Sequence, residues 1–359
     1  MKKIVFIINS ISNPRCIKRV NEFVDNGYNV VVYAFSRNES MHNQLKVDIK
    51  IVDSFSNDLS YSKRLPKLFR SIKKVVLTHR KDNVLYYLFA LDVAMIFRIC
   101  CRTSYIYEES DLQHTYISNT YVRNGMEWFD KQIIKKSLLS VFTSDGFIRY
   151  HFRDKRPENV YLIENKLDQN VQKLHFCNKH KFDKNNLSIG FVGFPRYESL
   201  YSFIDIFCKN FPSYTFHIYG APVNEKLKTC TKYNNCVLHG YFRTPDDLPS
   251  IYSNIDLVVS TYDTKYDNVR YAEPNKLYEA IYFETPIIVS SNTFLAEKVN
   301  NLGIGYDLDP FNESQIINLI DSLSCDNYLS KIECIKKIPK ESVININTAF
   351  FKKLNSLGI

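Results

Sequence analysis

Apolar and polar residues follow one another along the start of the chain in a strand–helix–strand pattern. Residues 4–8 form a continuous apolar run, which is typical of a parallel strand that is buried on both faces of a sheet. Ile17, Val20 and Phe23 then recur at helical spacing, and residues 28–35 supply a second apolar run. This order predicts a βαβ unit at the N-terminal end of the chain.

Further apolar runs predict more strands, and helical patterns separate most of them. In the first half of the chain these runs lie at residues 47–52, 84–89, 104–107, 139–143 and 160–163. A polar, weakly periodic stretch over residues 165–186 then predicts a linker between domains. After this stretch the pattern begins again, with strands predicted at residues 187–192, 214–219, 237–238, 257–260 and 286–289.

These patterns predict an α/β protein built from two Rossmann-like domains. We place the N-terminal domain at residues 1–170 and the C-terminal domain at residues 171–340, followed by a terminal helix in residues 341–359 that can cross back to the first domain. The loop after the first strand lacks the G-x-G-x-x-G fingerprint of dinucleotide-binding domains. Because ligands of open α/β sheets bind at the carboxyl ends of the strands, we expect the site in a cleft between the two domains.

Composition and charge narrow the class of protein. A chain of 359 residues is long enough for two domains, and its 45% hydrophobic residues exclude a disordered protein. The formal net charge of +9 fits nucleic acid, an anionic membrane surface or anionic small substrates, and does not choose among them. No run of about 18 uncharged apolar residues occurs, so no membrane-spanning helix is expected.

The positions of cysteine and histidine argue against a disulfide framework and against a metal site. The nine cysteines include no C-x-x-C pair, which is the usage expected in a reducing cytoplasm. The histidines show no convincing paired ligand spacing, so no metal site is predicted. Neither a P-loop nor a G-x-S-x-G elbow occurs in the sequence.

Residues 63–81 combine basic residues with apolar residues at helical spacing. The basic residues are Lys63, Arg64, Lys67, Arg70, Lys73, Lys74, Arg80 and Lys81. This pattern predicts a basic amphipathic helix, which fits an anionic membrane surface. A solvated helix face and nucleic-acid binding remain alternatives, but no nucleic-acid module accompanies the segment, so nucleic acid is not among the expected partners.

The segment from Tyr271 to Tyr282 is the most informative for chemistry. Pro274 suits the start of a helix, and the free N–H groups of a first helical turn form an anion site. Lys276 adds a positive charge at that end, and Glu279 lies about one turn further on, where its carboxylate can accept hydrogen bonds from a sugar diol. The segment therefore predicts a diphosphate at the helix tip with a ribose beside it, and a capped amphipathic helix with solvated charges is the alternative.

The residues Pro274-Asn275-Lys276-Leu277-x-Glu279-Ala280, followed by x-Pro-Ile-Ile-Val-Ser, resemble the donor-site signature of the retaining glycosyltransferases of the GT-B fold, especially family 4. The resemblance implies that the helix start, with Pro274 and Asn275, contacts the donor diphosphate and that Glu279 binds the nucleotide ribose. The family's first glutamate stands eight positions earlier, where this chain has Tyr271. Glu273 is the nearest acid and the candidate that replaces it.

A second resemblance lies where the strand pattern begins again, at Ile-Gly-Phe-Val-Gly-Phe-Pro-Arg over residues 189–196. In the family this strand and loop, here with Gly193, reach the donor phosphates, and an Arg and a Lys neutralise the leaving diphosphate. Arg196 matches the Arg by position. The usual Lys is absent, and Lys276 can supply its charge.

The first half of the chain resembles the family more weakly. Arg15, in the loop after the first strand, falls near the acceptor side of the family's site. Glu108, Glu109 and Asp111 fall where many members carry acidic or histidine residues that line the cleft. For each of these residues, the alternative is a charged side chain that only caps a helix or faces solvent.

Together these observations predict a glycosyltransferase that moves a sugar from a nucleotide-sugar donor to a hydroxyl of a glycan or lipid-linked glycan. The resemblance implies retention at the anomeric carbon and a role in bacterial surface polysaccharide synthesis, in the cytoplasm or peripherally at the inner membrane face. Arg196, Lys276 and Glu273 are the catalytic candidates, and no metal or cofactor besides the nucleotide sugar is expected. The alternatives are a non-catalytic binding subunit of the same fold, a sugar-nucleotide epimerase and a basic nucleic-acid binder.

Overall fold

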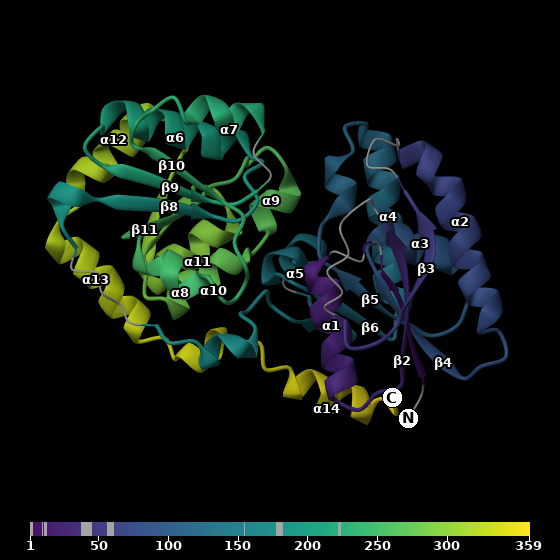
Figure 1. Ribbon diagram of the computed structural model, residues 1–359. Coiled ribbons are helices and arrows are strands. Elements are labelled where there is room, and N and C mark those ends of the chain that lie inside the picture. The colour runs from purple at the N-terminus through teal and green to yellow at the C-terminus, as the bar shows by residue number, and fades with distance from the viewer. Residues whose placement is uncertain are drawn as a thin grey trace. The chain divides into compact units, whose positions relative to one another are not determined.

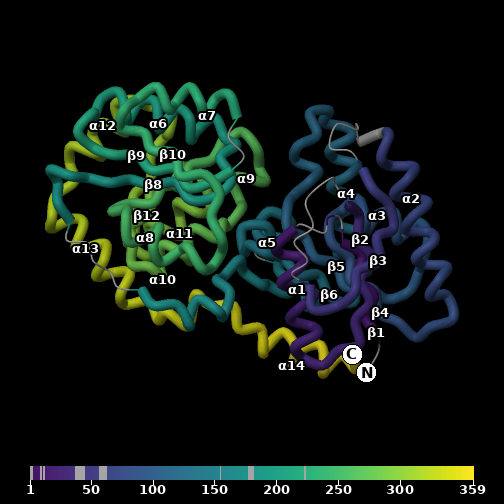
Figure 2. The backbone as a smooth tube through the Cα atoms, viewed as in Figure 1, coloured from purple at the N-terminus to yellow at the C-terminus, as the bar shows by residue number. Residues whose placement is uncertain are grey.

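The computed structural model describes residues 3–8, 10, 13–36, 45–55, 61–153, 155–176, 182–221 and 224–359. The chain divides into two compact units (Figures 1 and 2). The first unit comprises Met1–Ile163 together with Asn347–Ile359, and the second comprises Glu164–Ile346. The C-terminal segment therefore belongs to the same unit as the N-terminus.

The first unit is built on a seven-stranded sheet in the order β3-β2-β1-β4-β5-β6-β7, in which every pairing is parallel. Its strands are β1 (Lys3–Ile8), β2 (Val30–Ser36), β3 (Ile49–Ser54), β4 (Val84–Phe89), β5 (Tyr105–Glu109), β6 (Leu139–Phe142) and β7 (Val160–Leu162). Its helices are α1 (Pro14–Asp25), α2 (Tyr61–Thr78), α3 (Leu91–Cys100), the 3-10 helix η1 (Gln113–Tyr116), α4 (Thr120–Lys136), α5 (Asp145–Phe152) and α14 (Thr348–Ser356).

Helices cover both faces of this sheet. Adjacent side chains on a strand point to opposite faces, so neighbouring residues of one strand contact different helices. On β4 the Tyr87 ring packs edge-on against Phe23 of α1, with centroids 5.4 Å apart. Its neighbour Tyr86 packs against Phe97 of α3, with centroids 4.7 Å apart. Phe351 of α14 joins the α1 side, 5.2 Å from Phe23. The terminal helix is thus part of this hydrophobic core.

The second unit is built on a six-stranded parallel sheet in the order β10-β9-β8-β11-β12-β13. Its strands are β8 (Ser188–Val192), β9 (Thr215–Tyr219), β10 (Cys236–Gly240), β11 (Leu257–Ser260), β12 (Ile287–Ser290) and β13 (Gly305–Leu308). Its helices are η2 (Gln169–Lys173), η3 (Lys184–Asn186), α6 (Glu198–Asn210), α7 (Glu225–Cys230), α8 (Leu248–Ser253), α9 (Asp267–Tyr271), α10 (Asn275–Tyr282), α11 (Phe294–Leu302), α12 (Glu313–Ser322), α13 (Cys325–Lys336) and η4 (Lys340–Val343).

The strand order of the second sheet reverses beside β8. From β8 the chain moves to β9 and β10 on one side, and then returns to β11 on the other side of β8. Helices α6, α7 and α12 lie on one face of the sheet, and α8, α10 and α11 lie on the other (Figure 1). Such a reversal leaves a crevice at the carboxyl ends of the two strands that flank it, so the ends of β8 and β11 are where a ligand is expected.

The predicted fold class, α/β with two Rossmann-like domains, is confirmed. The stretch predicted as a linker packs on the second unit, where Leu167 forms a parallel bridge with Ile344 and Val171 is fully buried. Among the described helices, none has the length and apolar character needed to cross a bilayer.

Candidate functional site

Lys276 occupies the carboxyl end of β8 in the second unit. Its side chain leaves the first turn of α10 and is buried, with Nζ 4.5 Å from the centre of the Phe191 ring. Nζ also donates a hydrogen bond to the Tyr262 hydroxyl at 3.3 Å. No carboxylate in the described residues forms an ion pair with this amine. A buried ammonium that contacts aromatic rings and a hydroxyl, with no carboxylate at ion-pair distance among the described residues, lacks a full counter-charge.

Gly193 lies directly against this amine. The residue has a φ of 133°, and a Cβ at this position would lie 3.3 Å from Nζ of Lys276. Its N–H donates to the Tyr219 carbonyl, which anchors the turn at the end of β8. Glycine suits this position for two reasons. It adopts a backbone conformation that is unfavourable for other residues, and it leaves room for the Lys276 amine.

Arg196 brings a second positive charge to the loop after β8. Its side chain is exposed, and its guanidinium lies 4.9 Å from the centre of the Tyr197 ring and donates to that residue's hydroxyl at 2.8 Å. The Tyr197 ring packs edge-on against Tyr262, with centroids 5.0 Å apart, and Tyr262 contacts Lys276. Tyr197 and Tyr262 thus link Arg196 to Lys276, the two basic residues predicted to bind the diphosphate.

The amino terminus of α10 presents an uncapped helix end. Pro274 is its N-cap and makes no side-chain capping hydrogen bond, and Asn275 is exposed as the first helical residue. The nearby helix α6 differs, because the N–H groups of Glu198 and Ser199 donate to the carboxylate of Asp263. The end of α6 already has an internal anion, so an external anion fits the end of α10.

Glu279 lies one turn further along α10 and is almost completely buried. The Tyr252 hydroxyl of α8 donates to its carboxylate at 2.8 Å. Burial raises the pKa of Glu279 above its ordinary value, and this hydrogen bond and the charge of Lys276 offset part of the shift. The predicted contact of Glu279 with a ribose stays a prediction.

Glu273 lies in a separate polar cluster of the second unit. Its buried carboxylate accepts a hydrogen bond from Tyr278 and pairs with Lys298 of α11. Lys298 also lies 3.0 Å from Glu164, and the amide of Asn165 donates to the Glu273 carbonyl at 2.9 Å. Burial raises the pKa of Glu273, against the opposing effect of Lys298. These contacts hold the carboxylate inside the fold, and its part in catalysis stays a prediction.

The acceptor-side candidates lie at or near the carboxyl end of β5 in the first unit. Glu108 is fully buried and pairs with Arg19 of α1, whose Nε lies 2.9 Å from the carboxylate, and it also accepts from the Tyr87 hydroxyl. Arg15 donates to the Ser110 carbonyl at 3.3 Å. Glu108 therefore belongs to an internal ion pair, whereas Arg15 lies at the end of the strand.

Asp111 and Glu109 lie in different surroundings. Asp111 is exposed at the start of the segment after β5. Glu109 is buried on the opposite side of β5 from Glu108, where His151 of α5 lies 3.0 Å from its carboxylate. His114 and Asp130 join the same cluster. Residues so far apart in the chain show no ligand spacing, so the sequence does not predict this cluster.

Residues 178–340 match the family of glycosyl transferases group 1. No curated protein matches the chain by sequence. Among solved structures, HepE of Anabaena in complex with UDP and glucose superposes with a TM-score of 0.69 at 16% identity, over 100% of each chain. Sucrose-phosphate synthase from Thermosynechococcus elongatus gives a TM-score of 0.68 at 13% identity, over 99% of this chain and 98% of the other.

A structure of another class is also similar. A protein from Listeria monocytogenes described as a UDP-N-acetylglucosamine 2-epimerase gives a TM-score of 0.64 at 12% identity, over 93% of this chain and 91% of the other. At these identities the structural likeness shows the fold alone. The family match lies within the second unit, and the structural likeness extends the shared fold over both units.

Proposed function

We propose that this protein transfers a sugar from a nucleoside diphosphate sugar to a hydroxyl of a glycan or lipid-linked glycan, with retention at the anomeric carbon. The observation that carries the proposal is the buried amine of Lys276, which has no carboxylate partner among the described residues and lies beside the uncapped end of α10. A diphosphate would supply the missing counter-charge. HepE was solved with UDP, so UDP is the first nucleotide to test.

In the proposed reaction the bond between the anomeric carbon and the diphosphate oxygen breaks, and its electron pair leaves with the nucleoside diphosphate. The acceptor hydroxyl oxygen bonds to the anomeric carbon and releases its proton. Lys276, Arg196 and the first N–H groups of α10 stabilise the charge that develops on the diphosphate, as preorganised donors do at other oxyanion sites. Glu279 holds the nucleotide ribose.

The nucleotide part of the proposal is tested by binding measurements on a matched pair of variants. Lys276→Met keeps most of the aliphatic stem and removes the charge, whereas Lys228→Ala removes an exposed lysine that pairs with Glu225 on α7. We expect UDP and UDP-sugars to raise the melting temperature of the wild type and of Lys228→Ala, and to leave Lys276→Met unchanged. Equal stabilisation of all three proteins would contradict a diphosphate at Lys276.

Transfer is tested separately from binding. An epimerase is the second candidate, because the structure from Listeria monocytogenes has the same fold. An epimerase converts the nucleotide sugar without any acceptor, whereas a transferase releases the nucleoside diphosphate only slowly until an acceptor is added. Product analysis with and without lipid-linked acceptors therefore separates the two, and nucleotide binding with neither reaction would indicate a non-catalytic binding subunit.

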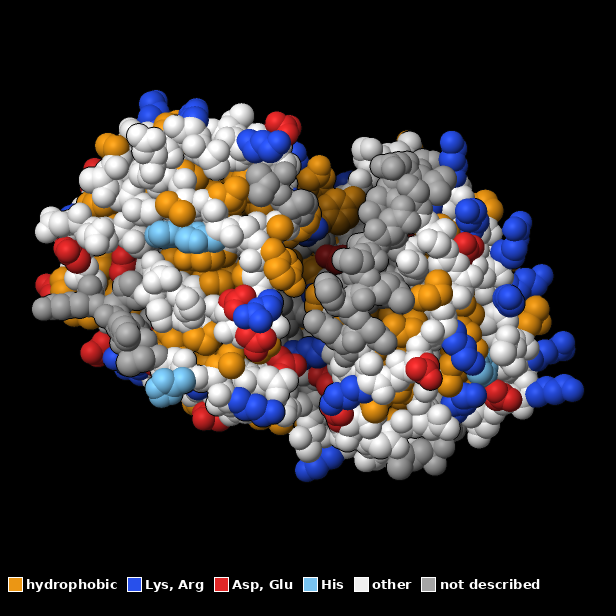
Figure 3. All heavy atoms as spheres, in the orientation of Figure 1, with side chains coloured by type: hydrophobic (Ala, Val, Ile, Leu, Met, Phe, Trp, Pro, Cys, Tyr) orange, Lys and Arg blue, Asp and Glu red, His pale blue; other side chains and the backbone are white. Residues whose placement is uncertain are grey.

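We further propose that α2 brings the protein to an anionic membrane surface. Its Leu68, Ile72 and Val75 are buried in the first unit, whereas Leu65 and Phe69 are exposed. Lys and Arg side chains gather over α2 on the face in Figure 3. The exposed basic residues of this helix are Lys63, Lys67, Arg70, Lys73 and Lys74. A basic face with exposed apolar side chains can bind anionic headgroups and insert into the lipid boundary.

A further inference from the structure

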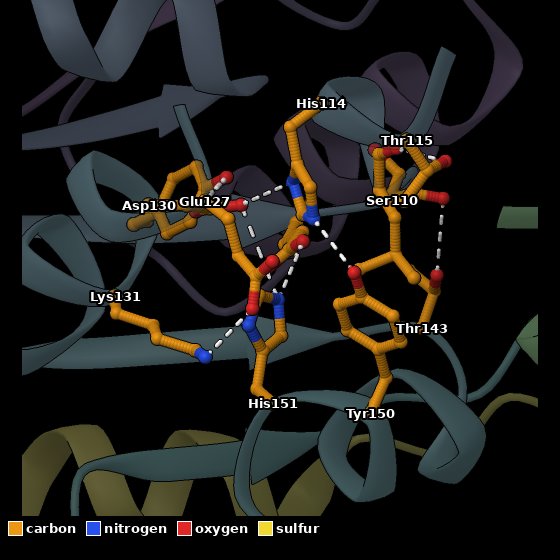
Figure 4. A network of polar contacts seen from close by, with 12 residues as sticks. Ser110, His114, Thr115, Glu127, Asp130, Lys131, Thr143, Tyr150 and His151 are labelled. Carbon is orange, nitrogen blue, oxygen red and sulfur yellow. Dashed lines mark hydrogen bonds and ion pairs between the residues drawn. The ribbon is translucent and has the colours of Figure 1, made fainter. Parts of the chain in front are cut away.

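A buried cluster of ionisable side chains lies at the carboxyl end of β5 in the first unit. Glu109 comes from β5, His114 from η1, Asp130 from α4 and His151 from α5. The side chains of all four are at most 1% exposed. Figure 4 shows the side chains of His114, Asp130 and His151 directed toward one another. The proposed transfer reaction uses none of these four groups at the donor site.

The separations between their polar atoms suit a shared ion. Nε2 of His151 lies 3.0 Å from Glu109 Oε1 and 4.0 Å from Asp130 Oδ2. One ligand atom from each of these three residues lies within 4.8 Å of the others. Ligand atoms about 2.0–2.2 Å from a tetrahedral zinc ion are roughly 3.3 Å apart. The observed separations lie on both sides of this value, so small side-chain rotations are sufficient to surround an ion.

Several polar atoms of the cluster have no hydrogen-bond partner. Within the part of the chain that the structure describes, these are Glu109 Oε2 and His151 Nδ1, while Asp130 Oδ2 and His114 Nδ1 make no hydrogen bond but lie 3.3 Å from each other. Buried polar atoms are almost always paired, and an unpaired one destabilises the fold. Two carboxylates enclosed in the same cluster also repel each other. A divalent cation would give the carboxylate oxygens a partner and remove the repulsion.

Further residues orient the candidate ligands. The Tyr107 hydroxyl donates to Asp130 Oδ1 at 3.1 Å, which leaves Oδ2 directed to the cluster. Tyr150 lies 3.3 Å from His114 Nε2, so the other ring nitrogen of His114 faces Asp130 Oδ2, also at 3.3 Å. Metal sites in proteins commonly have outer hydrogen bonds of this kind, which fix the orientation of the ligands.

We propose that Glu109, Asp130 and His151 bind a zinc ion, with His114 beside Asp130 orienting its carboxylate. The imidazole of His151 favours zinc and neighbouring transition metals over magnesium or calcium, and carboxylate oxygens also bind zinc. The ion joins the end of β5 to α4 and α5. It thereby stabilises the carboxyl end of this strand, near which Arg15 and Asp111 lie. The proposal is independent of the donor site, because all of its ligands belong to the first unit.

The experiment measures zinc in the full chain. The purified protein is stripped with a chelator, dialysed against a slight excess of Zn²⁺ and analysed by mass spectrometry for bound metal. We expect about one zinc ion per chain in the wild type, and a rise of the melting temperature when Zn²⁺ is returned. Asp130→Asn and His151→Gln should bind zinc at least about tenfold more weakly and lose this rise.

A surface histidine pair provides the matched control. His217 and His239 lie on neighbouring strands of the second unit with ring nitrogens 3.0 Å apart, and His239 is exposed. Such a pair binds zinc adventitiously, and His239→Gln removes it. We expect His239→Gln to keep the stoichiometric zinc. Zinc that is lost in His239→Gln but kept in Asp130→Asn would overturn the proposal, as would a wild type that binds none.

Cobalt substitution tests the site without relying on variants that could unfold. Co²⁺ in a site of four nitrogen and oxygen ligands gives intense visible absorption bands, whereas Co²⁺ in an octahedral, water-rich site gives weak ones. We expect intense bands in the wild type and in His239→Gln, displaced by one equivalent of Zn²⁺. Only weak bands in the wild type would contradict a zinc site enclosed by protein ligands.

Discussion

The amine of Lys276 lies so close to Gly193 that a single added carbon at residue 193 would be 3.3 Å away from it. The two residues come from different elements of the second unit, the turn after β8 and the first turn of α10. Their contact places the amine at the point where the strand order reverses. A change at either residue therefore acts on the same proposed anion site.

Gly193→Ala should weaken nucleotide binding and also destabilise the second unit. The new methyl group displaces the Lys276 amine, and the φ of 133° is unfavourable for alanine. We expect the free energy of unfolding to fall by about 1–3 kcal/mol and the affinity for UDP to fall with it, as measured by urea unfolding and calorimetry. Gly125→Ala is the matched control, because nothing lies within 4 Å of its Cβ and alanine favours the helix α4. Equal effects of the two substitutions would contradict the argument.

Glu279→Gln should show separately how Glu279 affects nucleotide binding and how it affects the free energy of unfolding. Burial raises its pKa above the ordinary 4.5. A carboxyl whose pKa is higher in the folded than in the unfolded state destabilises the fold as the pH rises above the unfolded value. The amide still accepts from Tyr252 but carries no charge. We therefore expect the variant to gain stability relative to the wild type between pH 5 and pH 8, while UDP binding weakens.

Urea unfolding at the two pH values checks the first part of this prediction, and calorimetry with UDP checks the second. A stability difference between variant and wild type that does not change with pH would show that Glu279 has the same pKa in both states. Unchanged UDP affinity would show that the carboxylate does not bind the nucleotide, and would leave the prediction about stability intact.

The ion pair between Arg19 and Glu108 should matter for stability more than for acceptor binding. Both side chains are buried, and Nε of Arg19 lies 2.9 Å from the Glu108 carboxylate. Removing one partner leaves the other charged and unpaired, so Arg19→Met should lower the free energy of unfolding by about 3–5 kcal/mol. The double variant Arg19→Met/Glu108→Leu should recover much of that loss in a double-mutant cycle. A stable Arg19→Met with a raised KM for the acceptor would instead assign Glu108 to the acceptor site.

Vesicle binding through α2 should depend on its exposed apolar side chains as well as its charge. We expect Leu65→Ser/Phe69→Ser to reduce sedimentation with vesicles that contain anionic lipids, while the melting temperature stays near that of the wild type, because both side chains are exposed. Tyr121→Ser on α4 removes a side chain that is 89% exposed and should leave sedimentation unchanged. Vesicle binding that is equal for all three proteins and for neutral lipids would exclude α2 as the docking helix.

The central strands could be predicted from the sequence because burial on both faces demands an uninterrupted apolar run. Residues 4–8, 84–89 and 257–260 follow this rule, and they form β1, β4 and β11. The edge strand β13 was missed, because its sequence Gly-Tyr-Asp-Leu alternates and Asp307 is exposed. The start of α10 was also predictable, since Pro274 suits the beginning of a helix.

Other features depended on contacts between distant parts of the chain. Strand geometry alone implies that Glu108 and Glu109 point to opposite faces, but only the packed helices decide that one meets Arg19 and the other meets His151. Leu167 and Val171 stand in a polar stretch, and their burial comes from packing on the second unit. The sequence by itself thus determined the positions of the central strands along the chain and the residues of the donor signature, because both follow from local periodicity and spacing. Only the tertiary structure brought Glu109, Asp130 and His151 together, because their proximity results from the packing of α4 and α5 around β5.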